Sequence, residues 1–108
     1  MQKCIDPDLM LNQYMVEISL PGMLTREFTN LIPAQRARVN ELIQAGSIQS
    51  YMLSIDRSRL WVVMNARSES QVSQLLDSFP IMTHCEALVH ELMFHDMATH
   101  QLPKMSMN

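Results

Sequence analysis

Apolar and polar residues alternate along residues 14–20, which read YMVEISL. Side chains of a β-strand point to opposite faces in turn, so this alternation predicts a strand with one buried face. One side of the strand carries Val16, Ile18 and Leu20, and the other side carries Met15, Glu17 and Ser19. Pro21 and Gly22 follow and end the strand, because proline cannot donate to a sheet ladder and the pair favours a turn.

From Thr25 the pattern changes to a helical period. One stripe of this predicted helix carries Phe28, Ile32, Val39, Leu42 and Ile43. Gly46 is placed as a C-terminal stop, since glycine readily adopts the left-handed conformation found after helices. Pro33 interrupts the segment, so the helix either kinks there or starts its main part there.

Residues 50–65, SYMLSIDRSRLWVVMN, predict a β-hairpin. We place its turn at Arg57 and Ser58, which pairs Asp56 with Arg59 and Leu53 with Val62. One face then carries Tyr51, Leu53, Ile55, Leu60, Val62 and Met64, and the other carries Ser50, Met52, Ser54, Trp61, Val63 and Asn65. The second face is too apolar for water and too polar for an ordinary core, so something must cover it.

A second helix is predicted after residue 68, where Ser68 and Gln71 match a capping box. Apolar residues recur at helical spacing as far as Phe79, and Pro80 ends the segment. Residues 86–94, EALVHELMF, fit a strand or a short helix. The topology favours the strand, because it completes a four-stranded sheet.

The element order β-α-β-β-α-β is that of an α+β, ferredoxin-like subunit, with a four-stranded antiparallel sheet and both helices on one face. We expect one domain at residues 14–96, a flexible N-terminal segment at 1–13 and a flexible tail at 97–108. The mixed sheet face would be an exposed apolar patch in a monomer. A second copy packed face to face would close it into a dimeric α+β barrel with a cavity.

Composition limits the classes of partner that we expect this protein to bind. The 108 residues carry a net charge of −3 with no basic cluster, which argues against nucleic acid and membrane surfaces. Two cysteines form no disulfide framework, and no signal peptide or apolar span of membrane length is evident, so we expect a cytoplasmic protein. The histidines His84, His90, His95 and His100 lack convergent spacing, so no metal site is expected.

The stretches ELIQAG, DRSRLWVV and LLDSFPI, with the pair Phe79-Pro80, resemble the muconolactone isomerase-like family of the dimeric α+β barrel superfamily. The resemblance spans about residues 14–95. It implies a homodimer or larger homo-oligomer, no metal or organic cofactor, and an enzyme that moves a double bond in a small lactone acid. The isomerases carry basic side chains on the first strand and an Asp/Glu/Lys cluster in the first helix. Here those stretches read Met15-Val16-Glu17-Ile18-Ser19 and Ala34-Gln35-Arg36.

The mixed sheet face supplies the candidate catalytic residues. Glu17 lies in mid-strand, where enclosure by a second copy would suit a general base, and His90 is the candidate second proton carrier. An alternative interpretation places Glu17 at the dimer rim, paired with an arginine. Trp61 could stack on a planar ligand or fill the interface. The remaining candidate ligand-binding residues are Ser19, Met52, Ser54 and Arg36, the last as an anchor for a carboxylate.

The expected function is therefore binding of a small lactone or carboxylic acid in a cavity of the dimer barrel, with cofactor-free isomerisation by proton transfer as the leading enzymatic version. Two alternatives stay open: a non-catalytic oligomerising or ligand-sensing protein, and a cofactor-free monooxygenase. The fold alone does not decide among them.

Overall fold

The computed structural model describes residues 11–96. Its elements in chain order are β1 (Asn12–Ser19), α1 (Arg26–Asn30), α2 (Ile32–Gln44), β2 (Ile48–Leu53), β3 (Arg59–Ala66), α3 (Glu69–Asp77), the 3₁₀ helix η2 (Pro80–His84) and β4 (Glu86–Glu91). The predicted order is confirmed, with the first helical segment divided into α1 and α2 and with η2 added. Residues 1–10 of the expected flexible segment 1–13, and the whole expected tail 97–108, lie outside the described residues. β1 begins two residues before the predicted strand.

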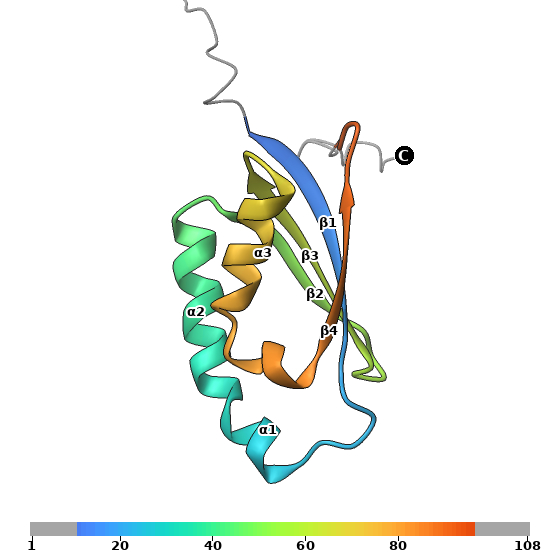
Figure 1. Ribbon diagram of the computed structural model, residues 1–108. Coiled ribbons are helices and arrows are strands. Elements are labelled where there is room, and N and C mark those ends of the chain that lie inside the picture. The colour runs from blue at the N-terminus through green and yellow to red at the C-terminus, as the bar shows by residue number, and fades with distance from the viewer. Residues whose placement is uncertain (1–10, 97–108) are drawn as a thin grey trace, which may run out of the picture.

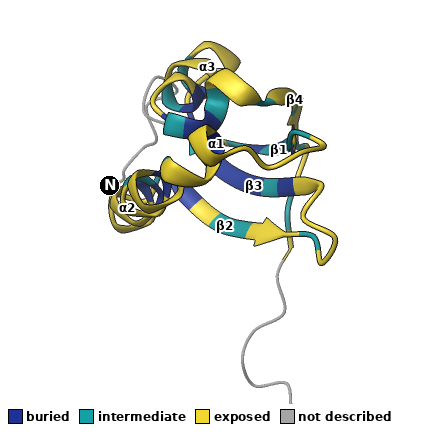
Figure 2. Ribbon diagram, turned by 90° about the horizontal axis from the view of Figure 1, so that it is seen from below, coloured by how far each residue is buried: buried dark blue, intermediate teal, exposed yellow. Residues whose placement is uncertain are grey.

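The four strands form one sheet in the order β2-β3-β1-β4, with every neighbouring pair antiparallel. All the helices lie on the same face of this sheet (Figure 1, Figure 2). The predicted ferredoxin-like α+β subunit is therefore confirmed. The opposite sheet face, which we call the open face, carries no helix from the described part of the chain.

The core lies between the sheet and the helices. At its centre Val16 of β1 pairs with Val62 of β3 on one side and with Val89 of β4 on the other. Val16, Ile18 and Val62 are fully buried, as the period-two pattern predicts. The helices cover these strands with Phe28, Val39, Leu42, Val72 and Leu76.

The start and end of the first helical segment follow local chemistry. Thr25 caps α1, its hydroxyl accepting a hydrogen bond from the Phe28 N–H at 3.1 Å. Pro33 lies in the first turn of α2, where its missing N–H costs nothing, and Gly46 has a φ of 85° after the helix. The predicted stripe is wrong at Ile32 and Ile43, which are exposed, because α2 turns Gln35, Val39 and Leu42 toward the core.

The hairpin has a longer loop than predicted. Leu53 pairs with Leu60, two positions away from the predicted partner Val62, and the Ser54 N–H donates to the Arg59 carbonyl at 2.9 Å. The register prediction was therefore wrong by two residues. Because strand side chains alternate with period two, an even shift leaves the predicted faces of the strand residues unchanged. Ile55, which was predicted on the apolar strand face, instead lies in the loop and is fully exposed.

The last helix and the last strand are of the types predicted from the sequence. Ser68 caps α3 by accepting from the Gln71 N–H at 3.2 Å, and the Gln71 side chain accepts from the Arg67 N–H at 2.8 Å. The closing segment is a strand, but β4 ends at Glu91, three residues before the predicted end. Among the described strands, β4 has β1 as its only neighbour in the sheet.

Candidate functional site

The open face gathers most of the candidate residues. Glu17 of β1 lies directly between Trp61 of β3 and Leu88 of β4. His90 is one pleat away, opposite Met15, while Met52 of β2 lies opposite Trp61. Ser19 lies at the end of β1, where it pairs with Arg59 and with Glu86. The structure therefore brings Glu17, Ser19, Met52, Trp61 and His90 onto one surface.

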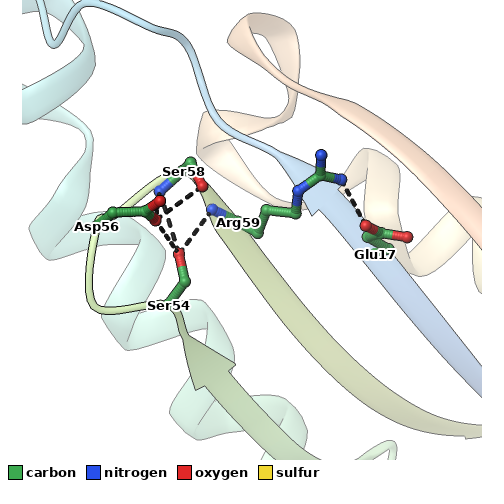
Figure 3. Close-up of polar contacts among 5 residues, drawn as sticks. All are labelled: Glu17, Ser54, Asp56, Ser58 and Arg59. Atoms are coloured by element: carbon green, nitrogen blue, oxygen red, sulfur yellow. Dashed lines mark hydrogen bonds and ion pairs between the residues drawn. The ribbon is translucent and has the colours of Figure 1, made fainter.

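Glu17 is held by an arginine. The Arg59 guanidinium (Nη1) donates to a carboxylate oxygen (Oε2) of Glu17 at 2.5 Å, and the close-up in Figure 3 shows the two side chains meeting across neighbouring strands. The Glu17 side chain keeps 28 % of its accessible surface and that of Arg59 keeps 46 %. The alternative interpretation of Glu17 from the sequence includes such a pairing with an arginine. Arg59 was not among the sequence candidates, although its position after the hairpin turn places it beside β1.

Ser54 belongs to the hairpin loop. Its hydroxyl donates to the Asp56 carboxylate at 2.7 Å and accepts from the Ser58 and Arg59 N–H groups at 3.1 and 3.0 Å (Figure 3). Hydrogen bonds from the side chains of Ser54 and Ser58, and from the Ser58 N–H, lower the pKa of Asp56 to about 2. This network fixes the loop that contains Arg57, the residue with a φ of 63°.

A cavity of about 400 Å³ lies on the other side of the sheet, between the helices and the β2–β3 hairpin. Five segments build it: the connection after β1, the two helices α1 and α2, the hairpin, and η2. Its apolar lining consists of Leu20, Leu24, Phe28, Ile32, Leu53, Leu60 and Ile81. The Phe28 ring packs edge to face against the His84 ring, with 5.9 Å between the ring centroids.

Two polar side chains, Gln35 and Tyr51, face each other inside this cavity. Gln35 is 4 % exposed, and its amide nitrogen (Nε2) donates to the Tyr51 hydroxyl at 3.3 Å. Its amide oxygen (Oε1) accepts from the Ile81 N–H at 3.4 Å. Burial raises the pKa of the Tyr51 phenol, an effect that the Gln35 hydrogen bond partly offsets and the nearby Cys85 reinforces. The phenol therefore stays protonated at neutral pH.

Two arginines line the same cavity at its exposed side. Arg36 comes from the second turn of α2 and Arg57 from the hairpin loop, and both are exposed. Within residues 11–96, neither has a carboxylate within ion-pair distance. Arg36 thus lies across the sheet from Glu17, so the structure does not join these two candidates in one site. Arg57, Gln35 and Tyr51 were missed from the sequence; a glutamine within an apolar helix stripe was the available signal for Gln35.

Within the described part of the chain, no cluster of three or more His, Cys, Asp or Glu side chains could hold a metal ion. No described helix is both long and apolar enough to cross a membrane.

These features define an α+β subunit of ferredoxin-like topology with an apolar cavity beneath its helices. Residues 10–98 match the muconolactone delta-isomerase family, so the chain belongs to that family and the resemblance noted from the sequence is confirmed. No curated protein sequence matches the chain significantly.

Two solved structures match the chain. One is MtbAldR, with a TM-score of 0.55 and 11 % identity, covering 91 % of this chain; the present chain spans 63 % of the length of that protein. The other is a conserved protein from Methanosarcina mazei Go1, with a TM-score of 0.41 and 11 % identity, covering 78 % of this chain and 94 % of that one. At such low identity, the likeness to MtbAldR shows the fold alone.

Proposed function

We propose that this protein binds a small, largely apolar carboxylic acid or lactone in the cavity between its helices and the β2–β3 hairpin. One observation carries the proposal: an apolar cavity with one internal polar pair has two arginines on its exposed side. Sites for small molecules are commonly concave, mostly apolar, and provided with a few polar groups that fix orientation. The family's named substrate, muconolactone, has this chemistry.

The dimensions suit a ligand of this size. A volume of about 400 Å³ falls in the lower part of the range known for small-molecule sites. The walls formed by Phe28, Leu60 and Ile81 are themselves buried, so they are supported by the core. A cyclic acid of about ten heavy atoms would place its ring against these walls.

Arg36 and Arg57 supply the positive charge that complements a ligand carboxylate. A guanidinium group binds carboxylate through two parallel N–H donors, and such charge-assisted bonds are stronger than neutral ones. Because Arg36 and Arg57 have no ion-pair partner within the described residues, a ligand carboxylate would not have to displace one. The two residues come from different elements, so a bound carboxylate would link α2 to the hairpin loop.

Isothermal titration calorimetry with muconolactone tests this proposal on the wild type and on a double variant, Arg36→Met with Arg57→Met. Methionine keeps much of the side-chain length while removing the charge. A suitable control is Arg67→Met, an exposed arginine that does not line the cavity. We expect binding by the wild type and the control, with about tenfold or greater weakening in the double variant. Equal affinity for all three proteins would contradict the proposal.

A second candidate function is cofactor-free isomerisation on the open face. The cavity lining contains neither a carboxylate nor a histidine, and the protonated Tyr51 phenol is a poor base. The only sequence-predicted carboxylate is Glu17, which Arg59 holds beside Trp61. In this alternative a second copy would pack on the open face, Glu17 would exchange a proton with a ligand enclosed there, and His90 would assist.

A spectrophotometric isomerisation assay on muconolactone compares the wild type, Glu17→Gln and Glu91→Gln. Glu91 lies in the same sheet but pairs with Tyr14, whose side chain is on the helix side, so this variant is the matched control. Loss of turnover in Glu17→Gln alone would support the second candidate. Absence of turnover in the wild type would remove isomerisation of this substrate and leave the binding function to be judged by calorimetry.

A further inference from the structure

The orientation of the Gln35 amide is fixed by its neighbours. The Ile81 backbone N–H can only donate a hydrogen bond, so the Gln35 atom that faces it at 3.4 Å must be the oxygen. The amide nitrogen is thereby turned toward the Tyr51 hydroxyl, 3.3 Å away. The nitrogen has no lone pair to offer, so it donates to the phenol oxygen.

This arrangement also determines what Tyr51 can offer. Its oxygen already accepts from Gln35, and its O–H has no acceptor among residues 11–96. Tyr51 lines the cavity, so a bound molecule can reach that hydrogen. Burial raises the pKa of the phenol, which keeps the hydrogen in place at neutral pH. The polar pair therefore presents a donor to the ligand.

We propose that Tyr51 is the group in this cavity that recognises the second hydrogen-bond acceptor of such an acid, donating its O–H to a ring carbonyl oxygen, and that Gln35 is the positioning residue of Tyr51. The inference rests on the proposed function of the cavity and assigns to it a residue that determines specificity. A ligand of this class has a carboxylate for Arg36 and Arg57, an apolar ring for the walls, and a carbonyl for Tyr51.

Two ligands that differ by one carbonyl oxygen test the preference: (3-oxocyclopentyl)acetic acid and cyclopentylacetic acid. Calorimetry gives the ratio of their dissociation constants for each protein. We expect the wild type to bind the keto acid roughly three- to tenfold more tightly, which corresponds to one net hydrogen bond. Because both ligands share the ring size and the carboxylate, the ratio reports the carbonyl contact.

Three variants locate the effect. In Tyr51→Phe the ratio should fall to about one, whereas Tyr14→Phe, the same change at a buried tyrosine that does not line the cavity, should keep the wild-type ratio. Gln35→Glu keeps the side-chain size but replaces the donor by a second acceptor, which captures the Tyr51 hydrogen. The ratio should therefore also fall in Gln35→Glu, although Tyr51 is intact. Circular dichroism confirms that each variant folds.

The outcomes separate the inference from the proposed function. If the wild type binds neither ligand, the proposed function of the cavity fails. If it binds both ligands equally, only the inference fails. A preference that persists in Tyr51→Phe would assign the carbonyl contact to another group, and one that persists in Gln35→Glu would refute the positioning role of Gln35.

Discussion

Gln35 is the one polar residue among the buried residues of the described chain, and replacing it with leucine should destabilise the fold. The change leaves the buried Ile81 N–H without its acceptor, and an unsatisfied buried donor costs about 1–3 kcal/mol. Tyr51 is half-buried and can turn its hydroxyl toward water. Loss of its hydrogen bond from Gln35 therefore adds little to the destabilisation. Better burial of leucine returns about 1 kcal/mol. The expected net loss is about 1 kcal/mol in the free energy of unfolding.

Urea denaturation followed by circular dichroism measures this loss, and thermal denaturation should show a midpoint lower by about 4–8 °C. The matched control is Gln44→Leu at the exposed end of the same helix, which should change the free energy by less than about 0.5 kcal/mol. If Gln35→Leu proves as stable as the wild type, the hydrogen bond to Ile81 contributes nothing. The Gln35 amide would then have no fixed orientation toward Tyr51.

Three further predictions concern charge, pH and assembly. Affinity of the cavity for a carboxylate should fall with added salt, and the slope of log affinity against log salt should flatten in the Arg36→Met/Arg57→Met double variant. The folded-state pKa of Asp56, about 2, is below its ordinary value of 3.8, so its stabilising effect is present above pH 3.8 and is lost as the pH falls toward 2. Acid titration of Asp56→Asn should lack this part of the pH dependence. Light scattering at micromolar concentration should show a dimer that dissociates in Leu88→Asp on the open face, whereas Ile55→Asp, at a fully exposed loop position off the sheet, should leave the dimer intact.

Much of the fold could be predicted because local patterns and topology agree. The alternation around Val16 and Ile18, the cap at Ser68 and the stop at Gly46 each depend on neighbours in sequence, and the structure keeps them all. The hairpin register escaped prediction because a two-residue slip preserves both strand faces. The true loop is set by the Ser54 and Asp56 network, which no hydrophobic pattern reveals.

The cavity escaped prediction for a different reason. Its residues come from five segments, and the rotation of α2 that places Gln35 inside and leaves Ile32 and Ile43 exposed is decided by tertiary packing. The candidates predicted from the sequence lie mostly on the open face, because strand alternation alone is enough to put Glu17 and Trp61 on the same face. Arg36 was selected for its chemistry, and the structure supplies the surroundings in which that chemistry can be tested.

Ligand binding in the cavity is tested most directly by a two-dimensional ¹H–¹⁵N spectrum of the protein titrated with muconolactone. The side-chain amide of Gln35 reports on the cavity, and the indole N–H of Trp61, the only tryptophan, reports on the open face. We predict that the Gln35 signal shifts in proportion to ligand bound while the Trp61 indole signal stays in place. A shift of the Trp61 signal with an unchanged Gln35 signal would contradict this prediction and place the ligand on the open face.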